Sequence, residues 1–327
     1  MIFEKKILVT GEAGFIGSHL IRRLVKSYPN YDIHGLDALT YAANRSYNID
    51  LEEHDNYHFH HINILDKKKL NDLFNKHQFS DIIHLAAESH VDNSISNPLL
   101  FAETNIIGTI NLLNLFKEYS SGRFLHISTD EVYGDLSFDE KPFDEKHAYS
   151  PNSPYSASKA SSDHFVQAYY KTYDLDLIST NCSNNFGPHQ HVEKLIPKII
   201  YCILNDKKIP IYGDGKNIRD WLYVDDHVDV LDIVFHDGVS GQKYNIGANN
   251  EISNIDLVKL ICTICYQKKL HNNPQDLISF TNDRLGHDIR YAINSSKLTK
   301  NLNWKPSDNF HSLLSHTIDW YVNMFKF

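Results

Sequence analysis

The chain has 327 residues and a formal net charge of −9, with 42% apolar and 22% charged residues. This composition excludes global disorder and allows about two domains or one large unit with an extension. The acidic excess argues against binding to nucleic acid or anionic membranes, because both require a basic surface. No apolar run approaches the roughly 18 residues of a membrane span, so we expect no membrane association.

The first residues and the cysteines indicate a cytoplasmic protein. The N-terminal sequence leads directly into fold-forming segments, without the small-residue cleavage site of a signal peptide. Four cysteines do not make a disulfide scaffold. Cys262 and Cys265 form a C-x-x-C pair, but no second pair or histidine cluster accompanies them in the sequence. We expect both to lie in the core on an amphipathic helix.

Histidine is abundant, with 20 residues, and three of these lie in a strand-like segment at His58, His60 and His61. A metal site would need a cysteine or carboxylate partner at ligand spacing, and the sequence shows none. We therefore expect structural histidines and no metal ion.

Strand-like and helical segments alternate through the first half of the chain. The expected strands span residues 6–10, 32–36, 57–62, 81–85, 123–127 and 175–180. The expected helices span residues 15–26, 67–77, 98–119 and 154–173. This alternation implies right-handed βαβ crossovers and therefore an α/β fold, a Rossmann-type doubly wound parallel sheet.

After about residue 184 the alternation weakens, and shorter elements are separated by Pro, Gly and aromatic residues. Residues 244–247 could return to the sheet as a seventh strand. We expect a dinucleotide-binding domain over residues 1–183, with a return segment near 221–247. Residues 184–327 are expected to form mainly a smaller, mixed α/β substrate lobe.

A glycine-rich turn, TGEAGFIG, connects the first expected strand to the first helix. In such a turn Gly11 permits the tight bend, Gly14 lets the backbone approach a pyrophosphate, and Gly17 allows close packing of helix on strand. The helix N-terminus then offers free N–H groups to phosphates. Asp37 follows Gly17 by 20 residues. A carboxylate at this position binds the hydroxyls of the adenosine ribose and repels a 2′-phosphate. The sequence therefore favours NAD over NADP. A purely structural turn is the alternative, but the strand–turn–helix context favours the cofactor site.

Tyr155 and Lys159 are four residues apart, which places them on one face of a helix. A nearby ammonium stabilises a phenolate, so we expect Lys159 to lower the pKa of Tyr155 and make it a general base. Taken alone, the spacing is common by chance, and only its place after a dinucleotide motif favours catalysis.

The sequence Ser128-Thr129-Asp130-Glu131 directly follows the fifth expected strand. Open α/β sheets bind ligands at the carboxyl ends of their strands. Thr129 could hydrogen-bond a substrate oxygen there, and two carboxyl groups in different environments could divide acid and base roles. A solvated acidic loop is the alternative.

These motifs together resemble the extended short-chain dehydrogenase/reductases, and within them the nucleotide-sugar 4,6-dehydratases, most closely the members that act on dTDP-glucose. The resemblance covers residues 6 to about 320. It is carried by TGEAGFIGS, HLAAESHVD, ISTDEVYGD, SPYSASKASSD, TNCSNNFGP, EKLIP, RDWLYVDDH, YNIG and DRLGHD. The Thr-Asp-Glu triplet is the specific part, since related epimerases usually lack the acidic pair.

The resemblance implies a hydro-lyase reaction with NAD. Tyr155, assisted by Lys159 and Thr129, would deprotonate the sugar 4-hydroxyl as hydride leaves C4. Glu131 would then remove the C5 proton, and protonated Asp130 would protonate the departing 6-hydroxyl. Hydride returns to C6, which gives the 4-keto-6-deoxy sugar. Family members are commonly homodimers through the helices around residues 98–119 and 154–173.

The resemblance also implies two sets of binding residues. Beside the three glycines of the turn, the residues matched to NAD contacts are Phe15, Ile16, Asp37, Ala38, Leu39, Thr40, Asn63, Ile64, Leu85, Ala86, Ala87, Thr104, Tyr155, Lys159 and Asn185. The residues matched to the nucleotide sugar are Ser89, Thr129, Asn184, Lys194, Leu195, Pro210, Tyr212, Arg219, Asn254, Arg284 and His287.

Three positions depart from the family pattern. Glu12 replaces a small glycine in the first turn, where a carboxylate is unfavourable near a pyrophosphate unless it points to solvent. Asn93 replaces an arginine near the cleft. Asn63 replaces an aspartate beside the adenine, a mild change because the amide carbonyl can still accept a hydrogen bond.

Other functions stay open on the sequence alone. The same reaction could act on UDP-glucose or UDP-N-acetylglucosamine, since one methyl group separates thymine from uracil. A nucleotide-sugar 4-epimerase would not depend on Asp130 and Glu131. A non-catalytic NAD-binding sensor would tend to lose Tyr155 or Lys159, and both are present.

Overall fold

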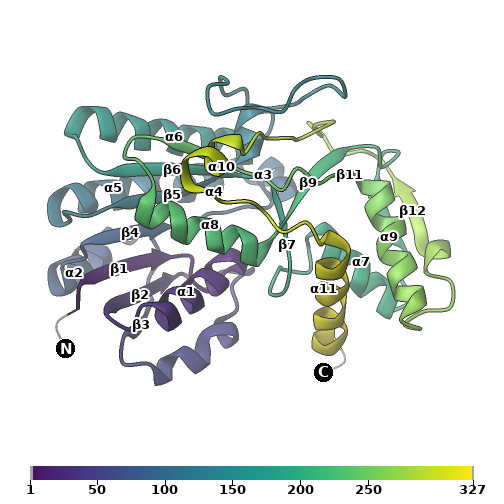
Figure 1. Cartoon of the computed structure of the whole chain (residues 1–327), viewed down its shortest axis with the longest axis horizontal. Helices are drawn as coiled ribbons and strands as arrows, with labels where there is room; N and C mark the ends of the chain where they lie inside the picture. Colours follow the sequence, from purple (N-terminus) through teal and green to yellow (C-terminus); the bar gives the residue numbers. More distant parts are fainter. Residues whose placement is uncertain (1–2, 326–327) are drawn as a thin grey trace.

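The computed structural model describes residues 3–325. Residues 1–2 of the predicted range 1–183 and residues 326–327 of the predicted range 184–327 therefore lie outside the described residues. The main body of the protein is a seven-stranded parallel sheet in the order β10-β6-β5-β4-β1-β2-β3 (Figure 1). The strands are β1 (Lys5–Thr10), β2 (Tyr31–Asp37), β3 (Tyr57–His61), β4 (Asp81–His84), β5 (Phe124–Thr129), β6 (Leu177–Cys182) and β10 (Lys243–Ile246). The predicted Rossmann-type sheet and its seventh strand are therefore confirmed, with strand ends shifted by one to two residues.

Helices cover both faces of this sheet. On one face, α1 (Phe15–Ser27) packs against α8 (Val224–Asp237). The other face carries α2 (Lys67–His77), α5 (Gly108–Tyr119) and α6 (Pro154–Tyr173). The strand order reverses between β1 and β4, which is the switch point where such sheets bind ligands.

The smaller part of the molecule holds two short sheets and three main helices on the right of Figure 1. The sheets have the orders β11-β9-β7 and β12-β8. Their strands are β7 (Asn184–Phe186), β8 (Ile209–Tyr212), β9 (Ile218–Tyr223), β11 (Glu251–Ser253) and β12 (Ile278–Thr281). The helices are α7 (Leu195–Leu204), α9 (Asn254–Gln267) and α11 (Phe310–Phe325). Cys262 and Cys265 are free and buried on α9, as expected for core residues.

Several short helical elements escaped the sequence analysis because they lack a full amphipathic period. These are the 3₁₀ segments η1 (Arg45–Glu53), η3 (Asp130–Tyr133) and η4 (Pro274–Leu277), and the helices α3 (Val91–Ser96) and α10 (Ser296–Leu302). The segment η3 begins immediately after β5, so it turns the Thr-Asp-Glu sequence across the end of the sheet.

The predicted helix over residues 98–119 is continuous but not uniform. It comprises α4 (Pro98–Phe101), a π-helical turn η2 (Ala102–Ile107) and α5. Among the described residues this stretch is long and apolar enough to cross a membrane by length and composition, which corrects the sequence-based statement. Half of it is buried inside the protein, and Asn105 hydrogen-bonds Glu88 and Ser158 there.

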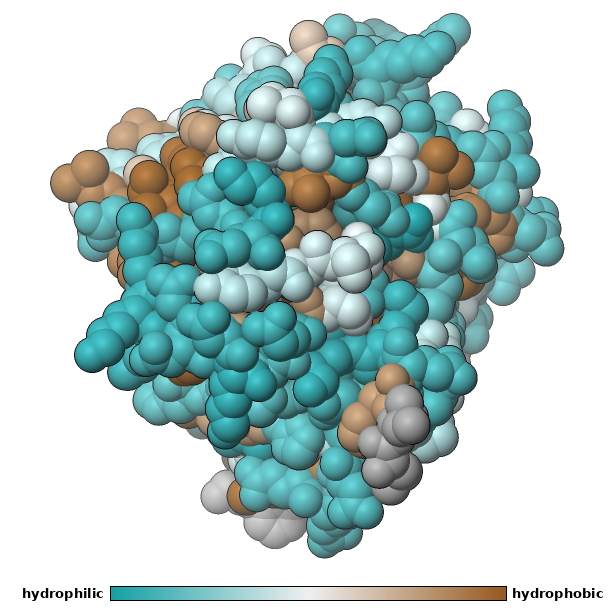
Figure 2. Space-filling model, turned by 90° about the vertical axis from the view of Figure 1, so that its left-hand side faces the viewer, coloured by the Kyte–Doolittle hydropathy of each residue, from teal (hydrophilic) through white to brown (hydrophobic). Residues whose placement is uncertain are grey.

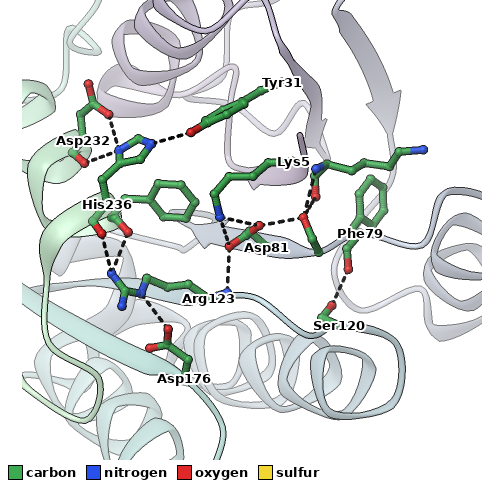
Figure 3. Close-up of polar contacts among 12 residues, drawn as sticks. Lys5, Tyr31, Phe79, Asp81, Ser120, Arg123, Asp176, Asp232 and His236 are labelled. Atoms are coloured by element: carbon green, nitrogen blue, oxygen red, sulfur yellow. Dashed lines mark hydrogen bonds and ion pairs between the residues drawn. The ribbon is translucent and has the colours of Figure 1, made fainter. Parts of the chain in front are cut away.

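Polar contacts connect the amino ends of the strands, opposite the switch point (Figure 3). The buried Asp81 carboxylate accepts hydrogen bonds from Lys5 Nζ at 3.1 Å and from the Arg123 backbone N–H at 2.8 Å. The Arg123 guanidinium in turn donates to Asp176 and to the Phe235 carbonyl at the end of α8. One buried carboxylate thus joins β1, β4 and the segment leading into β5.

We expect Asp81→Ala to lower the free energy of unfolding by about 2 kcal/mol, because it leaves the half-buried Arg123 N–H and Lys5 ammonium without this acceptor. Asp176→Ala is the matched control, since its carboxylate is one-third exposed, and it should cost less than about 1 kcal/mol. Urea unfolding followed by tryptophan fluorescence measures both values. Equal losses in the two variants would contradict the central role of Asp81.

Candidate functional site

A cavity of about 420 Å³ lies at the carboxyl ends of the central strands. It runs from the glycine-rich turn to the end of β6 and the start of α7. Of the sequence-predicted residues, those lining it are Gly11, Gly14, Phe15, Ile16, Gly17, Asp37, Ala38, Thr40, Asn63, Ile64, Leu85, Ala86, Ala87, Ser89, Thr104, Thr129, Asp130, Glu131, Tyr155, Lys159, Asn184, Asn185, Lys194 and Leu195. The fold therefore brings both candidate catalytic motifs and the dinucleotide motif to one space.

The turn after β1 is shaped so that two glycines are required. Gly11 has φ +75°, and a Cβ there would lie 2.7 Å from the Ala86 nitrogen. A Cβ on Gly17 would overlap the Gly11 carbonyl oxygen. Helix α1 therefore begins close against the turn, with its N-terminal N–H groups at the cavity, which is the arrangement that fits a pyrophosphate.

Asp37 lies at the end of β2 and lines the adenosine end of the cavity. Its Oδ2 accepts a hydrogen bond from the Ala13 N–H at 3.0 Å, and its Oδ1 accepts one from the Leu39 N–H at 2.8 Å. These bonds fix the carboxylate while leaving further lone pairs on both oxygens. The residues present thus fit the adenosine ribose of NAD. Leu39 itself is not among the lining residues of the cavity and has φ +53°.

The sequence suggests that the Glu12 side chain must point to solvent to be compatible with a nearby pyrophosphate. In the structure it points into the protein instead. Its side chain is fully buried beneath the turn, where Asn48 Nδ2 donates to Oε2 at 2.9 Å and the Tyr57 hydroxyl donates to the same atom at 3.1 Å. Burial raises the pKa of Glu12, while Arg45, Asn48 and Tyr57 oppose the rise. The carboxylate is therefore directed away from the phosphate site and ties the turn to residues 45–57.

Tyr155 and Lys159 lie in the first turns of α6, whose start is fixed by a capping box between Ser153 and Ser156. Both side chains are buried at the cavity. Lys159 Nζ donates a hydrogen bond to the Ile127 carbonyl at 2.8 Å. That contact holds the ammonium between α6 and β5.

The surroundings of Tyr155 raise its pKa overall, and the expected lowering by Lys159 stays a prediction. Burial raises the pKa of Tyr155 well above its usual range, the charge on Glu131 adds to this, and a hydrogen bond with Thr129 opposes it. Burial also lowers the pKa of Lys159. A buried phenolate therefore needs positive charge close to it.

Asp130 and Glu131 lie side by side in η3 but in different surroundings. Burial raises the pKa of Asp130 well above its usual range, and the charges of Glu131 and Asp220 raise it further. Burial also raises the pKa of Glu131, but three cations, Arg284, Arg219 and Lys194, oppose the rise. The arrangement favours a protonated Asp130 beside an ionised Glu131, as an acid and base pair requires.

Six predicted substrate residues lie outside the lining of this cavity, namely Pro210, Tyr212, Arg219, Asn254, Arg284 and His287. All six come from the smaller part of the molecule. The Tyr212 hydroxyl donates to Asp92 Oδ2 at 3.1 Å, and Arg284 Nε lies 3.8 Å from Asp92 Oδ1. These contacts place Tyr212 and Arg284 beside α3, next to the segment that carries Ser89.

Arg219 is buried, and protein groups already accept hydrogen bonds from part of its guanidinium. Its guanidinium donates to the Ile218 carbonyl at 2.7 Å and the Asp288 carbonyl at 2.9 Å, and it lies 4.2 Å from the Tyr291 ring centre. The resemblance matches Arg219 to a contact with the nucleotide sugar. Two backbone carbonyls already use two of its donor atoms.

The cavity is also lined by residues that the sequence analysis did not single out as ligands. They include Ala42, Ala43, Ile62, Leu65, Glu88, Cys182, Ser183, Gln190, His191, Glu193 and Trp221. Most occupy loops directly after strands, so the end-of-strand rule could have found Ser183 and Glu88. The His191 and Trp221 segments belong to the smaller part, whose packing the sequence pattern did not predict.

Comparisons with known proteins agree with this geometry. A family described as GDP-mannose 4,6 dehydratase matches residues 8–317. A dTDP-glucose 4,6-dehydratase of Escherichia coli is 47% identical, with 97% of this chain and 94% of that protein covered. The crystal structure of a dTDP-glucose 4,6-dehydratase from Bacillus anthracis in complex with NAD is 41% identical, with a TM-score of 0.88 and coverage of 99% and 98%. A dTDP-glucose 4,6-dehydratase structure from Streptomyces venezuelae, also with NAD, is 39% identical, with a TM-score of 0.90 and 97% of each chain covered.

We expect Gly17→Ala to weaken NAD binding at least about tenfold, because the added methyl must displace the turn at a cost of at least about 1.4 kcal/mol. Ser18→Ala is the matched control, one residue along the same helix, and should bind NAD nearly as the unaltered chain does. Isothermal titration calorimetry with NAD measures both affinities. Unchanged binding by Gly17→Ala would show that the close approach of α1 to the turn is not needed.

Proposed function

Since the chain belongs to the GDP-mannose 4,6-dehydratase family, we propose that it uses NAD to remove water from dTDP-glucose and form the 4-keto-6-deoxy sugar. The observation that carries this proposal is the pair Asp130 and Glu131 in one cavity with Tyr155 and Lys159. A dehydrogenase or epimerase needs the tyrosine and lysine only. An elimination needs an acid and a base as well.

The oxidation step uses Tyr155 as the base for the sugar 4-hydroxyl. Thr129 hydrogen-bonds Tyr155 and is placed to bind the same substrate oxygen. When bound, oxidised NAD supplies the hydride acceptor for C4 and a positive charge that favours the ionised form of Tyr155. Lys159, held by the Ile127 carbonyl, adds a second positive charge close to the phenol.

The elimination step uses the two acids of η3. The 4-ketone makes the C5 proton acidic, and ionised Glu131 removes it. Protonated Asp130 gives its proton to the 6-hydroxyl, which leaves as water. The hydride taken from C4 then returns to C6 and a proton returns to C5, which gives the 4-keto-6-deoxy sugar. Asp130 Oδ1 lies 3.3 Å from Thr129 Oγ1. Its buried Oδ2 has no hydrogen-bond partner among the described residues 3–325 and can carry the proton toward substrate.

Cations of the smaller part support binding of the substrate diphosphate. Lys194 lines the cavity and donates to the Ser89 carbonyl at 2.9 Å, and the positive charges of Arg219 and Arg284 act on Glu131. We propose the remaining predicted ligands, Asn184, Leu195, Pro210, Tyr212, Asn254 and His287, as contacts to the nucleotide and sugar. The division into a cofactor domain over residues 1–183 and a substrate lobe over 184–327 belongs to the same proposal.

We also propose a cytoplasmic homodimer. Exposed apolar side chains on α3, α4, η2 and α6 include Ile95, Leu99, Ile107 and Phe165. Figure 2 shows hydrophobic side chains on the upper part of the molecular face at the left of Figure 1, at the height of α5 and α6. A second copy that covers the exposed surface of α3, α4, η2 and α6 would bury these side chains.

The activity test is incubation of the purified protein with dTDP-glucose, and separately with UDP-glucose, followed by mass analysis of the product. We expect dTDP-glucose to give a product lighter by one water, and UDP-glucose to react more slowly by up to about 200-fold, the limit for one methyl group. A product of unchanged mass and altered stereochemistry would exclude dehydration and indicate an epimerase.

Two variants separate the chemical steps. Asp130→Asn should slow water loss by about 10²–10⁴-fold, the usual contribution of a general acid, because the amide has no proton to give. C4 oxidation should be less affected, and transient NADH absorbance reports it. Tyr155→Phe is the matched variant and should abolish oxidation itself. Full dehydratase activity in Asp130→Asn would show that the acid role is wrongly assigned.

For the dimer, we expect analytical ultracentrifugation to give twice the mass of the chain. Phe165→Glu should shift the protein toward the monomer, because it would bury a charge in the contact. Val239→Glu changes another exposed apolar residue, in the loop after α8, and should leave the dimer intact. Equal effects of both variants would contradict the assignment of this face.

A further inference from the structure

Five side chains at the outer edge of the sheet form a group that we call the edge cluster, consisting of Asp32, His34, His58, His60 and His77. His34 on β2 is directly opposite His58 on β3 in the parallel register. Asp32 and His60 lie two residues away from them on their own strands, and therefore on the same face. His77, the last residue of α2, covers that face. Strand pairing thus supplies the carboxylate that the linear sequence did not show.

Three of these side chains lie close together, and the described residues give Asp32 Oδ1 and His34 Nε2 no well-aligned hydrogen bond. Asp32 Oδ1 lies 3.1 Å from His34 Nε2 and 3.2 Å from His58 Nε2. Asp32 Oδ1 and His34 Nε2 are both buried, and neither has an aligned hydrogen-bond partner. Buried polar atoms without partners are rare, and a pair that face each other call for a ligand between them.

The other nitrogen of His34 shows which atom is free to bind. His34 Nδ1 and His60 Nε2 are hydrogen-bonded at 2.8 Å. When a neutral His34 ring carries its N–H on Nδ1 and donates it to His60, the lone pair of Nε2 faces the Asp32 carboxylate. Two acceptors at that distance repel each other unless a cation lies between them.

We propose that Asp32 Oδ1, His34 Nε2 and His58 Nε2 bind a divalent transition-metal ion, with Zn²⁺ as the best match. Imidazole and carboxylate ligands suit Zn²⁺, and tetrahedral bonds of about 2.0–2.1 Å place neighbouring donor atoms about 3.3 Å apart. The three donor atoms lie within 4.8 Å of one another. His58 is partly exposed, which leaves a route for the ion and a fourth position for water.

The surrounding groups complete such a site. With an ion on His34 Nε2, His34 Nδ1 would donate its N–H to His60 Nε2, 2.8 Å away, which is the outer hydrogen bond that orients most metal-bound histidines. Lys6 Nζ lies 3.3 Å from Asp32 Oδ2, so it contacts the oxygen that the ion does not use. His34, His60 and His77 also bring three nitrogens within 4.8 Å. That second set lacks a carboxylate to balance the charge, and its His34–His60 pair is already hydrogen-bonded.

The place of the edge cluster indicates a structural role. Asp32 and His58 each stand second in their strands, near the amino ends, whereas Asp37 at the carboxyl end of β2 lines the cofactor cavity. An ion held by β2 and β3 together would fasten the outermost strand of the sheet. We therefore expect the ion to affect stability and to leave catalysis nearly unchanged.

The test uses the full-length protein, stripped of metal with a chelator and titrated with ZnCl₂ by calorimetry. We expect one equivalent to bind and to raise the melting temperature, because an ion that binds only the folded state stabilises it. His58→Gln should weaken this binding at least about tenfold, as loss of metal-site partners does. His54→Gln, an exposed histidine four residues earlier, is the matched control and should bind Zn²⁺ normally.

Two further variants distinguish the possible donor sets. Asp32→Asn should weaken Zn²⁺ binding as His58→Gln does, whereas His77→Gln should leave it within about threefold. Loss of binding in His77→Gln with normal binding in His58→Gln would overturn the proposal in favour of the three-histidine set. No saturable binding of Zn²⁺ to the unaltered chain, or equal weakening in His54→Gln, would overturn any site in the edge cluster.

Discussion

The site depends on how closely helix α1 approaches the turn that follows β1. Gly17 leaves no room for a side chain against the Gly11 carbonyl, and Gly11 leaves none against the backbone of Ala86. These contacts set the height at which α1 begins, and therefore where its free N–H groups point. They also bring the ends of β1 and β4 together at the reversal of strand order. The cofactor side of the cavity follows from this one steric constraint.

The protonation states of the ionisable side chains at the site depend on how far each is buried from solvent. Asp130, Tyr155 and Lys159 are buried from solvent, and Glu131 is half-buried. Burial favours the neutral form of each of them, and the local partners decide which keeps its charge. Cations gather around Glu131, while Asp130 is close to other carboxylates. Two adjacent residues of similar chemistry can therefore perform opposite tasks.

The sequence predicts the parts of this protein that depend on local pattern. The strand–helix alternation, the glycine turn and Asp37 follow from periodicity and spacing, because a Rossmann-type unit repeats one local arrangement. The smaller part was predicted only in outline, since its strands of three to six residues are held by partners distant in sequence, such as Ile252 with Arg219. The direction of Glu12 and the pKa of Tyr155 also depended on distant partners. The edge cluster is similar, because strand register alone brings Asp32 to His58.

The π-helical turn at residues 102–107 has a consequence for how insertions and deletions act on this fold. A π turn holds one residue more than an α turn, and removing one residue rotates the rest of a helix by about 100°. With the turn in place, Thr104 faces the cavity while Leu112 and Phe116 face the core. Deleting a single residue here would turn either Thr104 away from the cavity or Leu112 and Phe116 away from the core. The π-helical turn therefore fixes how the cavity-lining residues are rotated about the helix axis relative to the core residues. The number of residues in this segment is constrained more strictly than their identity.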